Sequence, residues 1–404
     1  MDLVDGLRFF FDAGTVFDVN GGTLKMPASL TDGGAKAFTV TSSAEGGVFE
    51  INVPEGDTMR NTGMALTGSL KFVKSGLGVF DAAKAGQSYT GGTEATAGVL
   101  RSTLNGDGSS PFGSKTAGEK TITVRNAAFE MNNTWYTPYR LILDNGVLST
   151  TYVGDTKNEY NEGAIFGSSE LLSDSEWRTV SGGKLRIWVG HTTKLNGHKL
   201  NVNLENAYAP FIIGTQNSPN SVITFDDGTL VCSGGVVRVY NNFAGTINAT
   251  NVTLVMQSAL NMYGTANSQF NVRDYVAQYP GNGNAGSGPL NVFGTFKPSA
   301  HDVFYGCTMQ SGSTIDLSLR TKALPLASQY QSGDYTLKFA DNSTIYINTG
   351  DLKVNRKSPA ITWDEPPANI RTVKFKNADP ESTRTFVSRD NGVYALTGFV
   401  ILIK

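Results

Sequence analysis

The sequence is poor in charge and has no long hydrophobic run. Charged residues make up 17% of the 404 positions, with a net charge of −2, whereas an average globular chain has about 25% charged residues. The absence of lysine and arginine clusters argues against a nucleic-acid partner, because phosphate binding needs such clusters. No apolar stretch approaches the roughly 18–20 residues of a membrane-spanning helix. Hydrophobic residues, at 39%, still suffice for a large core. We therefore predict an ordered chain without a transmembrane segment.

Cysteine is scarce as well. The chain has two, Cys232 and Cys307, and neither lies in a C-x-x-C or zinc-binding spacing. Two buried thiols are favoured over a disulfide, but the sequence leaves their pairing open. The first residues lack the basic region, apolar core and cleavage site of an export signal. The sequence also leaves open whether the chain is a fragment of a larger protein.

Short alternating runs separated by turn residues fill the chain; examples are Thr121–Val124, Lys199–Leu204 and Thr344–Ile347. Alternation with period two places one face of a strand inward and the other outward. No window has a sustained helical stripe of apolar residues, so few helices are expected. Asn and Asp tolerate the left-handed backbone that tight turns need, and Gly adopts it without steric cost. The turn dipeptides are Asn20-Gly21, Asn105-Gly106, Asn145-Gly146, Asn196-Gly197, Asp227-Gly228 and Asn391-Gly392.

The spacing of the strands indicates an all-β solenoid. Strand centres recur at intervals of about 15–23 residues, which is typical of stacked coils. They lie near Val202, Ile223, Val239, Leu254, Asn271, Phe293, Asp316 and Leu337. A single β-sandwich has strands every 8–12 residues and ends near 100–250 residues. Two or three sandwich modules in series remain the alternative.

Residues 62–101 contain the most specific pattern, a K-x-G-x-G corner followed by a Y-T-G-G-T run. This segment resembles the autotransporter-associated β-strand repeat, although 81–86 depart from the usual approach to the tyrosine. Lys74–Gly76 and Gly91-Gly92 would form corners between rungs. The matching residues are Phe72, Lys74, Gly76, Gly78, Val79, Tyr89, Thr90, Gly91, Gly92, Thr93, Gly98 and Leu100.

The resemblance implies a fold and a cellular place. Repeats of this family form right-handed parallel β-helices in exported bacterial surface proteins, so it implies an extracellular or cell-surface location. It implies no enzymatic activity, because these repeats carry no catalytic motif. Either the chain is a piece of a longer protein, or it belongs to large surface proteins that lack a membrane-barrel translocator.

The last 50 residues differ from the rest. Residues 353–404 contain Trp363, the proline pair Pro366-Pro367 and a mixed-charge stretch. We interpret residues 1–352 as the solenoid and residues 353–404 as a C-terminal capping segment, with a hairpin at Asn391-Gly392. A further coil is the alternative. Exposed strand edges at the solenoid ends would favour self-association.

One aromatic cluster is a candidate binding site. Trp135, Tyr136 and Tyr139 lie within the segment TWYTPYR, and amphipathic aromatic rings suit the faces of sugars. Packing in the core or at a corner is the favoured alternative. These three residues are the sequence-based candidates for ligand binding.

The histidines and carboxylates form no convincing constellation. His191 and His198 are interpreted as exposed turn residues rather than metal ligands, and a His301–Cys307 nucleophile pair lacks a third group. Asp226-Asp227, Asp174 with Glu176 and Asp155 with Glu159 read as turn carboxylates. The segment Asn105–Gly108 resembles part of a calcium loop, so a surface Ca²⁺ is the only cofactor considered, and no metal site is predicted.

These observations favour a non-catalytic structural or adhesion protein, secreted or at the bacterial surface, that presents an elongated face. Its partners would be cell-surface or matrix components, including glycans. A β-helical polysaccharide lyase or hydrolase and a glycan-binding module remain alternatives. Hydrolysis would require two carboxylates about 5–9.5 Å apart in a cleft.

Overall fold

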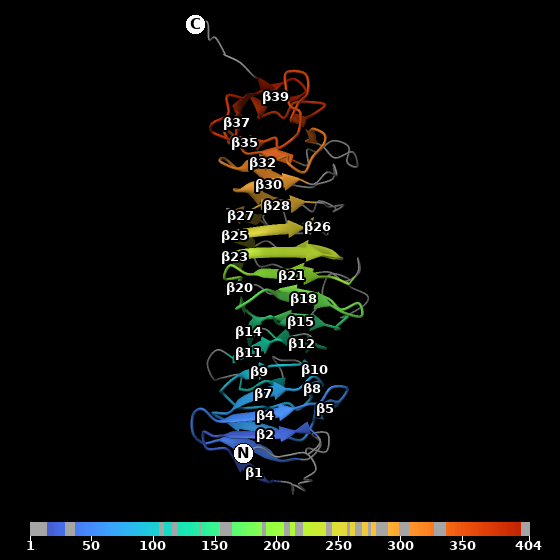
Figure 1. Cartoon of the computed structure of the whole chain (residues 1–404), viewed down its shortest axis with the longest axis vertical. Coiled ribbons are helices and arrows are strands. Elements are labelled where there is room, and N and C mark those ends of the chain that lie inside the picture. Colours follow the sequence, from blue (N-terminus) through green and yellow to red (C-terminus); the bar gives the residue numbers. More distant parts are fainter. Residues whose placement is uncertain are drawn as a thin grey trace. The chain divides into compact units, whose positions relative to one another are not determined.

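The computed structural model describes residues 14–28, 37–104, 109–114, 120–133, 135–136, 139–153, 164–187, 191–205, 211–214, 221–239, 245–256, 259–262, 269–273, 276–279, 290–298, 307–326 and 337–396. The chain divides into two compact units, Met1–Ile213 and Gly214–Lys404. In both units short β-strands pair in parallel register (Figure 1). The all-β prediction is thus confirmed, and parallel pairing contradicts the antiparallel sandwich alternative. Within the described part of the chain, no helix has the length and hydropathy of a membrane span.

The first unit contains one continuous stack of parallel strands. Each inward side chain lies over an inward side chain of the next strand, as Leu24, Phe49 and Phe72 do. Outward side chains are aligned in the same way. The strands are β2 (Thr23–Pro27), β4 (Val48–Asn52), β7 (Lys71–Ser75), β9 (Thr93–Ala95), β11 (Lys120–Arg125), β14 (Tyr139–Asp144), β17 (Ser169–Leu171) and β20 (Thr192–Lys194).

A second stack alternates with the first along the chain. Its inward column includes Phe80, Leu100, Phe129, Leu148 and Trp177, all buried. The strands of this stack are β5 (Thr58–Asn61), β8 (Val79–Ala82), β10 (Val99–Ser102), β12 (Ala128–Met131), β15 (Val147–Thr150), β18 (Ser175–Thr179) and β21 (Lys199–Asn203). Two shorter parallel sheets comprise β1 (Val16–Asp18), β3 (Thr39–Ser42) and β6 (Ala65–Gly68), and β13 (Trp135–Tyr136), β16 (Ala164–Phe166), β19 (Leu185–Ile187) and β22 (Phe211–Ile213).

The second unit repeats this parallel arrangement. From β25, one ladder runs through β27, β29, β31 and β34, and another runs through β28, β30, β32, β35 and β37. The strands are β23 (Val222–Ser233), β24 (Val236–Val239), β25 (Thr246–Met256), β26 (Ala259–Met262), β27 (Gln269–Arg273), β28 (Val276–Tyr279), β29 (Leu290–Val292), β30 (Thr295–Pro298), β31 (Cys307–Met309), β32 (Thr314–Asp316), β34 (Leu337–Phe339), β35 (Thr344–Asn348) and β37 (Lys374–Asn377).

The structural repeat in the second unit is longer than the shortest predicted interval between strand centres, about 15 residues. Ile223 pairs with Ile247 and Phe225 with Ala249, whereas Val239, which the spacing placed between them, belongs to a different sheet in β24. Each repeat therefore includes strands from more than one sheet, and counting all strand centres in one series shortens the apparent interval.

The C-terminal segment contains an antiparallel hairpin. β38 (Thr385–Arg389) pairs with β39 (Gly392–Leu396), which also pairs antiparallel with β36 (Ile361–Thr362), and β33 (Leu324–Pro325) completes this sheet. The hairpin prediction is confirmed, with Asp390 and Asn391 as the turn residues. The short 3₁₀ turn η2 (Ile370–Thr372) precedes β37. That residues 353–404 form a cap stays a prediction.

Asparagine and aspartate occupy left-handed corners, as expected from the sequence. Asn20, Asn145, Asn196 and Asp227 have φ values of 44–55°. Asn145 also donates a hydrogen bond from Nδ2 to Oδ1 of Asn126, the corner residue of the neighbouring strand, at 2.8 Å. Such bonds align successive corners, so these residues both turn the chain and link neighbouring strands.

A lysine occupies an inward position in β7. Lys74 lies in register between Ile51 and Ala95 and is completely buried. Its ammonium group donates hydrogen bonds of 2.6 Å to the carbonyl oxygens of Gly76, Gly78 and Ala97. Burial lowers the pKa of Lys74 from 10.5 to about 8. The lysine of the K-x-G-x-G pattern therefore satisfies three corner carbonyls from inside the core.

The lowered pKa of Lys74 predicts that stability depends on pH. Between pH 8 and 10.5 the unfolded chain keeps a proton on this amine that the folded chain releases, so the free energy of unfolding rises with pH. We expect a gain of about 2 kcal/mol from pH 8 to 10 in the unmodified chain. Urea unfolding at both pH values measures this gain in the free energy of unfolding. The same measurement on Lys74→Met gives the gain that comes from all other titrating groups. An equal gain in this variant would contradict the assignment.

Gly76 and Gly56 provide a matched test of corner packing. Both have left-handed φ values, 76° and 83°, but a Cβ atom at Gly76 would lie 2.2 Å from the carbonyl oxygen of Val53, whereas Gly56 faces open space. Gly56→Ala should lose about 1 kcal/mol from the backbone conformation alone. Gly76→Ala should lose about 1–2 kcal/mol more because of the overlap. Urea midpoints compare the two variants, and equal losses would show that the corner relaxes freely.

Candidate functional site

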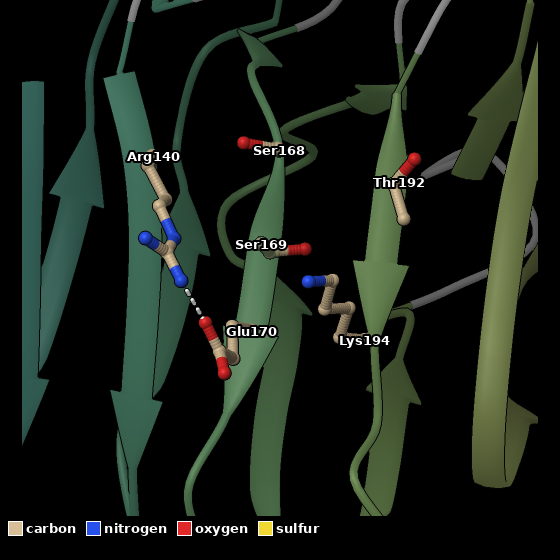
Figure 2. Close-up of a pocket in the computed structure, with 6 residues that line it drawn as sticks. All are labelled: Arg140, Ser168, Ser169, Glu170, Thr192 and Lys194. Carbon is tan, nitrogen blue, oxygen red and sulfur yellow. Dashed lines mark hydrogen bonds and ion pairs between the residues drawn. The ribbon is translucent and has the colours of Figure 1, made fainter. Parts of the chain in front are cut away.

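A hollow lies on the outward side of three neighbouring strands of the first unit. It has a volume of about 200 Å³ and lies between β14, β17 and β20 (Figure 2). The parallel register aligns Ile142 with Glu170 and Glu170 with Lys194. The lining residues are Arg140, Ser168, Ser169, Glu170, Thr192 and Lys194.

Glu170 is fixed at the centre of the hollow. Its Oε2 accepts a hydrogen bond from Arg140 of β14, and its Oε1 accepts one from Nδ2 of Asn196 at 3.2 Å. The contact with Arg140 is the main cause of a pKa for Glu170 below its ordinary value, and Lys194 contributes to the same shift. Glu170 is therefore an ionised acceptor at neutral pH and is unsuited to donate a proton.

Lys194 lies on the opposite side of Glu170 from Arg140. Its side chain is exposed and extends from β20 toward β17 (Figure 2). Ser168 is also exposed, and Thr192 is half-buried. The hollow thus combines two cations, one carboxylate and two accessible hydroxyl groups.

This charge balance differs from the rest of the same face. Lys25 pairs with Glu50 at 3.3 Å. Lys71 contacts Glu94, and Arg125 lies between Glu94 and Asp144. In those groups each cation contacts a carboxylate directly, whereas Lys194 makes no ion pair among the described residues. Lys194 therefore adds a positive charge to the hollow that no direct contact among the described residues neutralises.

Beneath the hollow lies a buried polar group that faces inward. The Ser169 hydroxyl lies 3.3 Å from Nε2 of His191 and 3.0 Å from the hydroxyl of Thr193, and Nε2 lies 2.8 Å from that same hydroxyl. All three residues are buried. Ser169 also lines the hollow, but His191 and Thr193 do not, and the ring of His191 packs against Trp177, so we assign this Ser–His contact a structural role.

The prediction that His191 is an exposed turn residue is wrong. The residue precedes β20, and its ring packs edge-on against Trp177 with centroids 6.5 Å apart. Its burial is compensated by Ser169 of β17 and Thr193 of β20, two inward hydroxyl residues within hydrogen-bonding distance of the imidazole. His198 is partly exposed, and its Nδ1 lies 3.9 Å from Asp174. His301 lies outside the described residues.

The aromatic candidates do not line this hollow. Tyr139 begins β14, is 3% exposed, and packs edge-on against Phe112 with ring centroids 6.1 Å apart. Trp135 and Tyr136 form β13 of another sheet, and their side chains lie outside the described part of the structure. Tyr139 therefore packs in the core, which is the alternative that the sequence favoured over ligand binding.

Of the predicted turn carboxylates, Asp174 and Asp227 lie at corners, whereas Glu176 lies inside strand β18, where it pairs with Val147 and Asn201, so the turn prediction is wrong for Glu176. Asp227 has φ 55° and accepts a hydrogen bond from Asn251 at 2.6 Å. Asp174 accepts one from the backbone of Lys199 at 2.8 Å. Among the described residues, no group of three or more His, Cys, Asp or Glu could hold a metal ion. Asp155, Glu159 and the Asn105–Gly108 loop, the expected Ca²⁺ position, fall outside those residues.

Cys232 is a buried thiol that forms no disulfide. Burial raises its pKa to about 12, so it is an unreactive core residue. This agrees with the preferred interpretation of the sequence for Cys232.

Comparisons with known proteins provide no further assignment. The chain matches no family model, no curated protein and no solved structure.

Sequence reasoning missed the hollow altogether. Arg140, Glu170 and Lys194 are distant in sequence, and each is an ordinary charged residue in a short strand. The available signal was that each of them occupies an outward position in its strand, within the segments YRLILD, SEL and TTK. This signal locates a site only when the register between β14, β17 and β20 is known.

Proposed function

We propose that this chain is a non-catalytic structural or adhesion protein of the bacterial surface or of the secreted fraction, with an elongated passenger-type fold. Its parallel strands would close into a right-handed β-helix. The observation that carries the proposal is the uninterrupted parallel register from β2 to β20. Such a ladder satisfies the backbone of every inner strand and leaves edges only at the ends.

The corner at Lys74 supports the proposed kinship with the autotransporter-associated repeat. A Cβ atom at Gly78 would lie 2.1 Å from the carbonyl oxygen of Pro54, and one at Gly98 would lie 2.4 Å from the ammonium of Lys74. These close approaches give a physical reason for the glycines of the pattern. The lysine has an equally specific reason, since it binds three carbonyls of that corner.

The outward face favours attachment over catalysis. The hollow offers a single, fixed carboxylate, whereas glycoside hydrolysis needs an acid and a second carboxylate. Partners would be matrix or cell-surface components, including glycans, and the ends of the fold would permit self-association. The alternative function is that of a polysaccharide lyase or hydrolase, which the following experiment would reveal through product release.

A retention assay tests this function. The purified chain is applied to beads coated with acidic polysaccharide, neutral polysaccharide or matrix protein, and the supernatant is assayed for reducing ends and unsaturated sugars. We expect the folded chain to remain on at least one surface without releasing product. The urea-unfolded chain serves as the control for this retention. Sustained product release, or no retention on any surface, would contradict the proposal.

A further inference from the structure

Among the described residues, Lys194 makes no direct ion pair, whereas Lys25, Lys71 and Arg125 on the same face each contact a carboxylate. The Lys194 ammonium also makes no hydrogen bond within that part of the chain, and the side chain is exposed. Lys25 occupies the same register column but pairs with Glu50 at 3.3 Å. Nothing in the fold requires Lys194 to be charged, so its charge is available to a ligand.

Glu170 does not neutralise Lys194 by direct contact. Both of its oxygens accept hydrogen bonds, one from Arg140 and one from Asn196. Figure 2 shows the carboxylate directed toward Arg140 of β14. An anionic group entering the hollow would therefore meet Lys194 first and Arg140 behind it, with Glu170 able to accept from a neighbouring hydroxyl.

The remaining lining groups suit a polyol. The exposed Ser168 and the half-buried Thr192 each offer a hydroxyl that can donate and accept. The volume of about 200 Å³ is below the roughly 300–1,000 Å³ of pockets for drug-sized ligands. The space therefore suits one charged sugar ring of a longer glycan that continues along the face.

We propose that this hollow binds an anionic sugar, with Lys194 contacting its carboxylate or sulfate and Ser168 and Thr192 contacting its hydroxyl groups. The inference rests on the proposed function, because it names the ligand class of the adhesive face. Carboxylated and sulfated sugars share the chemistry that the hollow recognises, and the experiment distinguishes them.

Oligosaccharide binding to the full chain tests the hollow directly. The probes are trigalacturonate, its methyl ester, and a sulfated galactose trisaccharide, titrated by calorimetry at low salt. We expect the acidic sugar to bind and its ester not to bind. Lys194→Gln should weaken binding about tenfold, the value of one charged hydrogen bond. Lys25→Gln, the matched control, should change it less than twofold, and both variants should keep the Tm of the parent.

Each outcome bears on the proposal. Binding of the sulfated probe instead of the uronate, with the same loss in Lys194→Gln, supports the hollow and identifies sulfate as its anion. Equal binding of the ester, equal effects of the two variants, or no binding of any probe overturns it. Bead retention without oligosaccharide binding would reject the proposed sugar site in the hollow but not the proposed adhesive function. Cleavage of a bound probe would reject the non-catalytic function while leaving the hollow in place.

Discussion

Replacing Lys74 with methionine should lower the free energy of unfolding by about 1–3 kcal/mol at pH 7, because leaving three carbonyl groups unpaired costs more than burying the ammonium. The ammonium is fully buried and donates to three carbonyl oxygens. Methionine has a similar length but no donor, so those acceptors would lose their partner in a partly dehydrated corner. Urea unfolding followed by circular dichroism measures the change.

Lys71→Met is the control for this prediction. Lys71 lies three residues earlier in the same strand, but its side chain is 44% exposed and contacts Glu94 at the surface. Exposed ion pairs contribute about 0–1 kcal/mol, so this variant should stay within that range. Equal losses in the two variants would mean that the buried hydrogen bonds of Lys74 contribute nothing beyond a surface pair.

Trp177→Ala should cost about 3–5 kcal/mol, the range for removing a buried aromatic side chain. The indole is completely buried in β18, in register between Leu148 and Val202. It also packs edge-on against Phe211 with centroids 5.8 Å apart. Its loss would leave a cavity between two strands that cannot approach each other, because their spacing is set by backbone hydrogen bonds.

The comparison for Trp177→Ala is Leu172→Ala, at a corner where the leucine is 46% exposed. This variant should change the unfolding free energy by less than about 0.5 kcal/mol. Thermal and urea unfolding of both proteins give the values. A loss below about 1 kcal/mol for Trp177→Ala would mean that the surrounding residues fill the cavity, although backbone hydrogen bonds fix the spacing of the strands.

Local features could be predicted from the sequence. Alternation identified strands such as β11, β21 and β35, since an inward–outward pattern needs only neighbouring residues. The left-handed corners at Asn20, Asn145, Asn196 and Asp227 followed from the residues that tolerate positive φ. The hairpin before β39 was predicted in the same way, although its turn uses Asp390 and Asn391.

The candidate site could not be predicted, because it depends on register between strands that are distant in the chain. A one-residue shift in any pairing would move Glu170 or Lys194 to the opposite face. The same dependence explains His191, whose burial follows from Ser169 and Thr193 being in register at inward positions. The repeat length was also misjudged, because the chain order of strands does not tell which of them belong to one sheet.

The sequence by itself determined that this protein is all-β, where many of its strands and corners lie, and that its corners rely on Asn, Asp and Gly. These properties depend on backbone preferences and alternation over a few residues. Only the tertiary structure decided which strands are neighbours, that Lys74 binds three carbonyls, and that Lys194 is left unpaired beside Arg140 and Glu170. Those properties depend on backbone hydrogen bonds between distant strands, which align side chains that no local pattern brings together.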